Sequence, residues 1–312
     1  MSKPRPFRFG IQTSAPKSRT DWAELARRAE GQGFSCLTMP DHFGNQMAPM
    51  PALMAAAAAT EKLRVGALVF DNDFKHPVVL AKELATMDLL SDGRLEIGLG
   101  AGWLKSDYQQ SGIPFDSAGV RIDRFVEALH IIKRAMQPGK FSFGGDHYTI
   151  TDYEGHPQPV QDNPPIMIGG GGKRVLAIAA READIVGINA SMHAGTIGPE
   201  TFADMTARAV DEKIAIVRAA AGDRLSEIEL SVPAFMFNVT DGDGAQARSR
   251  LAENLNVDAE MLQTSPFSLI GSPPELIERL LERRERWGFS YVIIASTDVE
   301  KFAPVVAALA GT

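Results

Sequence analysis

The sequence of 312 residues contains little cysteine and no excess of positive charge. Its one cysteine, Cys36, lies in the apolar stretch GFSCLTMP. One thiol excludes a disulfide framework, and its apolar setting predicts a small buried side chain rather than a nucleophile. The net charge of −7 argues against general binding to nucleic acid or to a membrane surface, because such binding needs clustered Lys and Arg.

Long hydrophobic runs and metal-binding spacings are also missing. The N-terminal MSKPRPFRFG has no apolar signal segment, and PALMAAAAAT is too short and too rich in alanine to span a bilayer. We therefore expect a cytoplasmic protein that does not bind membranes. The six histidines show no ligand spacing such as His-Glu-x-x-His, so we expect no metal site.

Short apolar runs alternate with amphipathic helical stretches along most of the chain. The first cycles are FRFGIQ, DWAELARRAEGQGF, SCLTMP and PMPALMAAAAAT, and later ones include a helix over 199–222 and a strand over 228–239. Eight strand candidates predict an α/β fold, a (β/α)8 or TIM barrel. We expect one domain over 1–312 with insertions near 103–118 and 139–163, the second containing a hairpin around Gly144 and Gly145. An open doubly wound sheet is the alternative.

The most informative motif is a run of four glycines, Gly169, Gly170, Gly171 and Gly172, between an apolar strand and a helical pattern. Backbone N–H groups and the positive end of the helix can surround an anion there, with Lys173 and Arg174 alongside. Phosphate is the expected guest, although a flexible tight turn is the alternative reading. A nucleotide-binding P-loop is disfavoured because Arg174 stands where that motif needs Ser or Thr.

Polar residues follow other strands at what would be the same end of the barrel. His42 follows Asp41 after the second strand, where an imidazole near a carboxylate can act as an acid or a base. Trp103 ends the strand of GLGAGW and could line a cavity. The acidic stretch FDNDFK, residues 70–75, either shapes the entrance to the site or forms a solvated loop. We expect a solvated loop.

Several segments together resemble the luciferase-like monooxygenase superfamily, in its coenzyme F420-dependent oxidoreductase branch. They include GFSCLTMPDHF, the helix ending in SDGR, the strand end GLGAGW and the block HPQPVQDNPPIMIGGGGKR. The resemblance covers nearly the whole chain in order. It implies a TIM barrel that holds a flavin or a 5-deazaflavin at its C-terminal mouth.

The resemblance also implies roles for individual residues. The cofactor phosphate would lie at the glycine run, and a non-prolyl cis peptide bond at Leu68–Val69 would support the ring. His42 would exchange a proton with the reacting centre, with Asp41 as its acidic neighbour in a shared catalytic pair. Polar contacts to the ring edge would come from Gln12 and Asp41. The complete expected cofactor set comprises Gln12, Asp41, Leu68, Val69, Gly100, Ala101, Gly102, Trp103, Gly169, Gly170, Gly171, Gly172 and Lys173.

We expect coenzyme F420 rather than FMN, and hydride transfer to or from a small organic substrate. The anionic tail of F420 would need a cationic groove, for which the candidates are Lys75, Lys105, Arg121, Lys173 and Arg174. Trp103 and Leu104 stand where sugar-phosphate dehydrogenases of this branch have a glutamate, which argues against a sugar phosphate. The alternatives are an FMN-dependent monooxygenase that uses O2 and a non-catalytic binding protein. By analogy with the family, we expect a homodimer.

Overall fold

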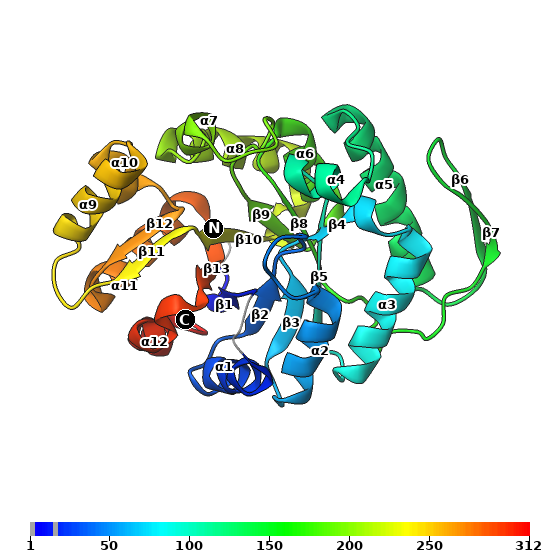
Figure 1. Ribbon diagram of the computed structural model, residues 1–312, viewed down its shortest axis with the longest axis horizontal. Helices are drawn as coiled ribbons and strands as arrows, with labels where there is room; N and C mark the ends of the chain where they lie inside the picture. Colours follow the sequence, from blue (N-terminus) through cyan, green and yellow to red (C-terminus); the bar gives the residue numbers. More distant parts are fainter. Residues whose placement is uncertain (1–3, 15–17) are drawn as a thin grey trace.

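The computed structural model describes residues 4–14 and 18–312, so the first three residues of the N-terminal stretch analysed above lie outside the described part. A closed parallel barrel forms its centre (Figure 1). The strand order is β3-β2-β1-β13-β10-β9-β8-β5-β4, and pairing of β3 with β5 closes the ring. Since β3 and β4 are two pieces of one barrel strand, separated by Leu68 and Val69, the expected (β/α)8 barrel is confirmed and the open sheet is wrong.

The barrel strands are short and mostly buried, as expected for parallel strands covered by helices. They are β1 (Arg8–Gln12), β2 (Cys36–Met39), β3 (Arg64–Ala67), β4 (Phe70–Asp71), β5 (Leu95–Gly100), β8 (Ile166–Gly170), β9 (Ile185–Ile188), β10 (Glu229–Ala234) and β13 (Phe289–Ala295).

An outer layer of helices covers these strands, and local capping fixes where several of them begin. Ser18 accepts a hydrogen bond from the backbone of Asp21, and Ser272 forms a capping box with Glu275. The outer helices are α1 (Arg19–Gly31), α2 (Pro49–Ala58), α3 (Pro77–Leu90), α5 (Ala118–Ala135), α6 (Lys173–Glu182), α8 (Ala207–Ala221), α11 (Pro273–Trp287) and α12 (Val299–Leu309).

Further short elements connect or extend the barrel. Next to its mouth lie η1 (Asn72–Phe74), α4 (Lys105–Ser111) and α7 (Pro199–Ala203). The antiparallel hairpin β6 (Phe141–Gly144) and β7 (Thr149–Tyr153) forms where the sequence predicts it and lies at one extreme of the molecule in Figure 1. The remaining turns are η2 (Gly222–Ser226) and η3 (Ser296–Asp298).

Two expected elements are each broken in the structure. The helix expected over 199–222 divides into α7 and α8, because the Thr206 side chain accepts a hydrogen bond from the Ala209 amide and starts a new helix. The strand expected over 228–239 ends at Ala234. Beyond Phe235, β11 (Met236–Val239) leaves the barrel and pairs in parallel with β12 (Ser268–Gly271).

The β11–β12 pair belongs to a third extension of the barrel, which we did not predict. In the chain, the helices α9 (Ala245–Leu255) and α10 (Ala259–Thr264) come between β11 and β12. This unit lies at the opposite end of the molecule from the hairpin in Figure 1.

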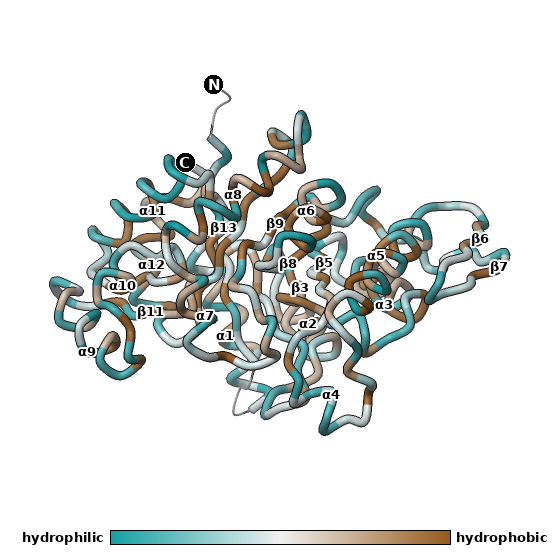
Figure 2. The backbone as a smooth tube through the Cα atoms, turned by 90° about the horizontal axis from the view of Figure 1, so that it is seen from above, coloured by the Kyte–Doolittle hydropathy of each residue, from teal (hydrophilic) through white to brown (hydrophobic). Residues whose placement is uncertain are grey.

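The apolar core follows the barrel strands. The hydropathy colouring of Figure 2 places hydrophobic segments at the centre and hydrophilic ones on the outer turns. Phe9, Ile11 and Leu37 are fully buried, and so is Cys36, whose thiol pKa is raised mainly by burial. In the described ranges, no helix combines the length and the apolar character needed to cross a membrane.

Candidate active site

A cavity of about 490 Å³ opens at the C-terminal ends of the barrel strands. In a parallel barrel this end carries the loops that can vary without disturbing the core. The expected catalytic and cofactor-binding residues all line the cavity except Gln12. The Gln12 amide instead lies 3.4 Å from the Leu68 carbonyl oxygen, to which it donates, so it supports the wall from behind. The roles that the resemblance implies for these residues remain predictions.

One wall is formed where β3 gives way to β4. The Leu68–Val69 peptide bond is cis, as the resemblance implies. The neighbouring strand β5 accommodates this bulge with glycines. A Cβ atom added at Gly100 would lie 2.5 Å from Val69 Cγ2, and one at Gly98 would lie 1.9 Å from the Ala67 carbonyl oxygen. Glycine is therefore required at both positions for packing against the bulge.

The four glycines of the sequence motif do not share one environment. Added Cβ atoms at Gly169 and Gly170 would meet the side chains of Val69 and Val175, at 3.3 and 2.5 Å. A Cβ atom at Gly171 would lie within 2.5 Å of backbone atoms of residues 189–191. Only the Cβ atom at Gly172 would meet nothing within 4 Å. Packing within the protein thus explains Gly170 and Gly171, Gly169 is tightly packed, and Gly172 faces open space.

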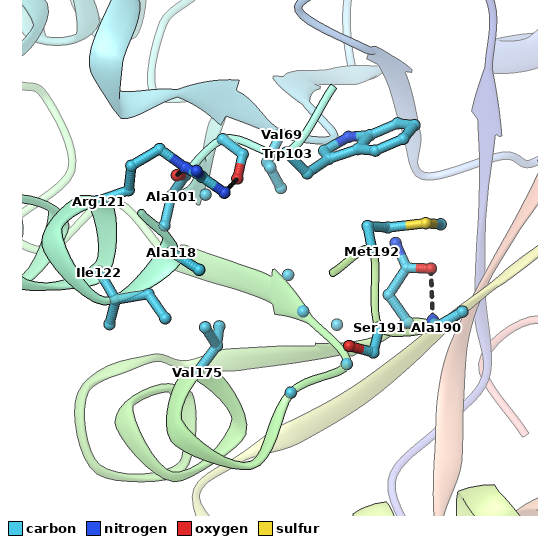
Figure 3. A pocket seen from close by; sticks show the side chains of 18 of the residues that line it. Val69, Ala101, Trp103, Ala118, Arg121, Ile122, Val175, Ala190, Ser191 and Met192 are labelled. Atoms are coloured by element: carbon cyan, nitrogen blue, oxygen red, sulfur yellow. Dashed lines mark hydrogen bonds between the residues drawn. The ribbon is translucent and has the colours of Figure 1, made fainter. Parts of the chain in front are cut away.

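Gly172 is also the N-cap of α6, and no side chain of the described residues caps it. The first backbone bond of the helix runs from the Leu176 amide to the Gly172 carbonyl, so the amides of 173–175 have no acceptor within the helix. These amides and the helix dipole favour an anion at the cavity wall. Residues 170–172 line this end of the cavity together with Val175, whose side chain is labelled in Figure 3.

His42 lies on another wall and is tied to a carboxylate that the sequence analysis missed. Its Nδ1 lies 2.6 Å from Asp107 Oδ2, in α4. Trp103 packs edge-on against the imidazole, with 5.6 Å between ring centroids. His42 and Asp107 are 65 residues apart in the chain, and no spacing rule connects them. Only the fold, which places the turn after β2 beside the segment after β5, could reveal this pair.

The hydrogen-bond partner of His42 is Asp107 rather than Asp41, and a shared catalytic role of Asp41 and His42 stays a prediction. Asp41 Oδ2 accepts a hydrogen bond from the Asp71 amide, at 3.2 Å. Burial is the largest cause that raises the pKa of the Asp41 carboxyl. Asp41 therefore joins the turn after β2 to the end of β4.

The acidic FDNDFK segment is not the solvated loop that we expected. Asn72 is buried, and the Asp73 side chain is 2% exposed. The Tyr108 hydroxyl lies 3.0 Å from Asp73 Oδ2 and 3.2 Å from Asp71 Oδ2, and Arg124 forms an ion pair with Asp73. Burial is the main cause that raises the pKa of Asp71, to about 7, and the charge of Asp73 adds to it.

The cationic part of the cavity is smaller than expected. Arg121, Lys173 and Arg174 line it, whereas Lys75 pairs with Glu83 and neither Lys75 nor Lys105 belongs to the lining. The Arg121 guanidinium donates to the carbonyl oxygens of residues 101 and 102, both at 3.3 Å, as drawn in Figure 3. Arg121 therefore braces the strand end, and Arg174 pairs with Asp123. Among the described lining cations, this leaves Lys173 to meet an anion.

The rest of the lining is largely apolar and was only partly foreseen. Ile122, Val175 and Met192 join Val69 and Trp103 around the space shown in Figure 3. Met192 belongs to the loop 189–198 between β9 and α7. Within residues 4–14 and 18–312, no group of three or more His, Cys, Asp or Glu side chains is placed to hold a metal ion.

A helix start without a side-chain cap, a largely apolar lining and the His42–Asp107 pair thus meet at the mouth of one TIM barrel, where enzymes of this fold carry their active sites. A model of the luciferase-like monooxygenase family matches residues 5–291. The chain belongs to this family and is an enzyme, which corrects the non-catalytic alternative.

Known relatives carry either of two cofactors in their names. The FMNH2-dependent dimethylsulfone monooxygenase of Pseudomonas putida is 28% identical over 327 residues, covering 90% of this chain and 87% of the relative. The F420-dependent glucose-6-phosphate dehydrogenase of Amycolatopsis mediterranei is 29% identical over 187 residues, covering 57% and 56%. The chain also shares its fold with the solved F420-dependent tetrahydromethanopterin reductase from Methanopyrus kandleri, at a TM-score of 0.79, 20% identity and 98% coverage of both chains.

Proposed function

We propose that this enzyme is a coenzyme F420-dependent oxidoreductase acting on a small organic substrate. The observation that carries the proposal is the open, uncapped start of α6 at Gly172, in a cavity whose other wall is built on the Leu68–Val69 bulge. The N–H groups of 173–175 and the charge of Lys173 fit a phosphodiester with an anionic tail, while Arg174 pairs with Asp123 beside them.

Each wall of the cavity has a distinct part in the proposed reaction. When bound, the deazaflavin supplies a ring carbon that gives or takes a hydride. The start of α6 holds the phosphate, and Leu68 and Val69 support the ring. His42 exchanges a proton with the substrate atom that changes its charge. The apolar lining excludes water and favours a substrate with an apolar body over a sugar phosphate.

An FMN-dependent monooxygenase is the second candidate, and one observation favours it. The FMNH2-dependent relative aligns with 90% of this chain, whereas the F420-dependent dehydrogenase aligns with 57%. The two reactions differ chemically, because a deazaflavin lacks the ring nitrogen through which reduced flavin reacts with O2.

Equilibrium titration of the protein with F420 and with FMN tests the two candidates. We expect the dissociation constant of F420 to be lower by about tenfold or more, which corresponds to about 1.4 kcal/mol. Preferential binding of FMN, together with O2 consumption when reduced FMN is supplied, would select the monooxygenase. Binding of neither cofactor would overturn both.

A further inference from the structure

Asp107 holds the turn after β2 with both of its carboxylate oxygens. Oδ2 lies 2.6 Å from His42 Nδ1, and Oδ1 accepts a hydrogen bond from the Phe43 amide at 3.3 Å. The Asp107 side chain is 7% exposed and that of His42 is 27% exposed. The carboxylate is therefore sheltered, while the imidazole reaches the cavity.

The chemistry of this contact fixes which imidazole nitrogen carries hydrogen. A carboxylate only accepts hydrogen bonds, so Nδ1 must be the donor. In the uncharged ring, Nε2 is then the nitrogen without hydrogen, and it can accept a proton. Trp103 packs against the ring and opposes its rotation.

Asp107 also places a carboxylate directly beside the imidazole. Among the ion pairs of residues 4–14 and 18–312, His42 is its one partner. Asp41, adjacent to His42 in the chain, also faces it electrostatically, but the hydrogen bond that its Oδ2 accepts comes from the Asp71 amide.

We propose that Asp107 is a positioning residue for His42: it holds the hydrogen on Nδ1 and leaves Nε2 to exchange a proton with the ligand in the cavity. The inference rests on the proposed function, in which His42 is the proton-transfer group. When a ligand hydroxyl gives its proton to Nε2, the O–H bond breaks, the N–H bond forms and the electron pair stays on oxygen. The resulting imidazolium lies beside the Asp107 carboxylate, which stabilises it.

Nitrogen-15 NMR of the histidine side chains tests this without any cofactor. The signals of His42 are identified as those lost in His42→Gln, which is practical because the chain has six histidines. In the wild type we expect Nδ1 to be protonated and Nε2 to be free of hydrogen. In Asp107→Asn, whose amide can donate to Nδ1, the opposite tautomer should become populated. Asp107→Glu, which keeps the charge, should restore the wild-type pattern at least in part.

Kinetics with whichever cofactor binds supply the second measurement. We expect Asp107→Asn to lower kcat by about tenfold or more, with a smaller change in KM. Asp211→Asn is the matched control, because it removes an equal charge from an ion pair between α8 and α11, on residues that do not line the cavity. A wild-type His42 with hydrogen on Nε2, or an Asp107→Asn variant changed only in melting temperature, would overturn the proposal. Failure of both cofactors to bind would leave the NMR result standing and would overturn the proposed function alone.

Discussion

At the scale of single residues, His42 is the group on which the proposed reaction depends. We expect His42→Ala to lower turnover by about 100-fold or more, since positioned acid–base groups contribute at least that much. The affinity for the cofactor should change by less than about threefold, because the phosphate site at α6 is separate. Steady-state kinetics and cofactor titration measure the two effects.

His42→Ala also leaves Asp107 without its partner, so a companion variant is needed. His42→Gln retains a side-chain donor for the buried carboxylate and should show the same loss of turnover. Turnover near the wild-type rate in both variants would remove His42 from the reaction.

Asp71 makes the stability of the fold depend on pH, because its pKa is about 7 in the folded protein against an ordinary value of 3.8. Between these values the folded state binds more protons than the unfolded state. The free energy of unfolding therefore falls as the pH rises from about 4 to 7, by up to about 4 kcal/mol from this group. We expect Asp71→Asn to flatten that fall, because an amide does not titrate.

Denaturant unfolding at several pH values tests the role of Asp71. The control is Asp211→Asn, since the hydrogen bond from Arg286 lowers the pKa of Asp211 and its contribution is lost only as the pH falls below about 4. This variant should keep the fall between pH 4 and 7. If Asp71→Asn and wild type lost stability in parallel over that range, Asp71 would be ionised throughout.

At the scale of elements, the junction of β8 and α6 contains one glycine that packing requires, Gly171, and one that faces open space, Gly172. Gly171→Ala would place a methyl group within 2.5 Å of the backbone of residues 189–191, and we expect it to cost about 1–3 kcal/mol of stability. Gly172→Ala meets nothing within 4 Å, and its φ of −79° suits alanine. It should cost at most about 1 kcal/mol in the fold and yet weaken cofactor binding, because the methyl group enters the space left for phosphate.

Thermal unfolding and cofactor titration of both glycine variants make the comparison. The expected pattern is a large loss of stability in Gly171→Ala and a selective loss of affinity in Gly172→Ala. Affinity unchanged in Gly172→Ala would place the phosphate elsewhere.

The sequence predicts the elements of the barrel better than the contacts at its mouth. Apolar runs alternate with amphipathic helices because every parallel strand is buried and every outer helix has one buried face, and this pattern is local. By contrast, the break at Phe235 depends on pairing with β12, some 30 residues later along the chain, as the register of Met236 with Ser268 shows. The sequence pattern of 228–239 remains apolar across that break, so the periodicity could not reveal it.

The candidate site likewise has features that the sequence predicts and features that only the fold reveals. The glycine run and the polar residues after the strands predict which segments line the cavity, because parallel strands bring their ends together. The sequence could not tell which glycine faces ligand, since Gly171 is required by the distant loop 189–191. Nor could it show that Asp107, rather than Asp41, holds His42, because both lie close to strand ends.

At the scale of the whole molecule, the barrel gathers its functional groups at one end and leaves two of its three extensions away from them. The hairpin β6–β7 and the unit of β11 and β12 stand at opposite extremes in Figure 1, and none of their residues lines the cavity. The cavity forms part of the folded barrel, so its occupation should stabilise the entire fold. Ligand binding is then measurable as resistance to unfolding, independently of catalysis.

Riboflavin and FMN differ only by a phosphate, and they therefore isolate what the start of α6 contributes. A ligand at 100 times its dissociation constant stabilises the folded state by about 2.7 kcal/mol, which raises the melting temperature by roughly 5 °C in a chain of this size. We expect FMN and F420 to raise it and riboflavin at equal concentration to raise it by less than half as much. In Gly172→Ala the difference between FMN and riboflavin should shrink, because the methyl group obstructs the phosphate alone. Equal stabilisation by riboflavin and FMN in the wild type would show that the ring, and not the helix end, provides the affinity.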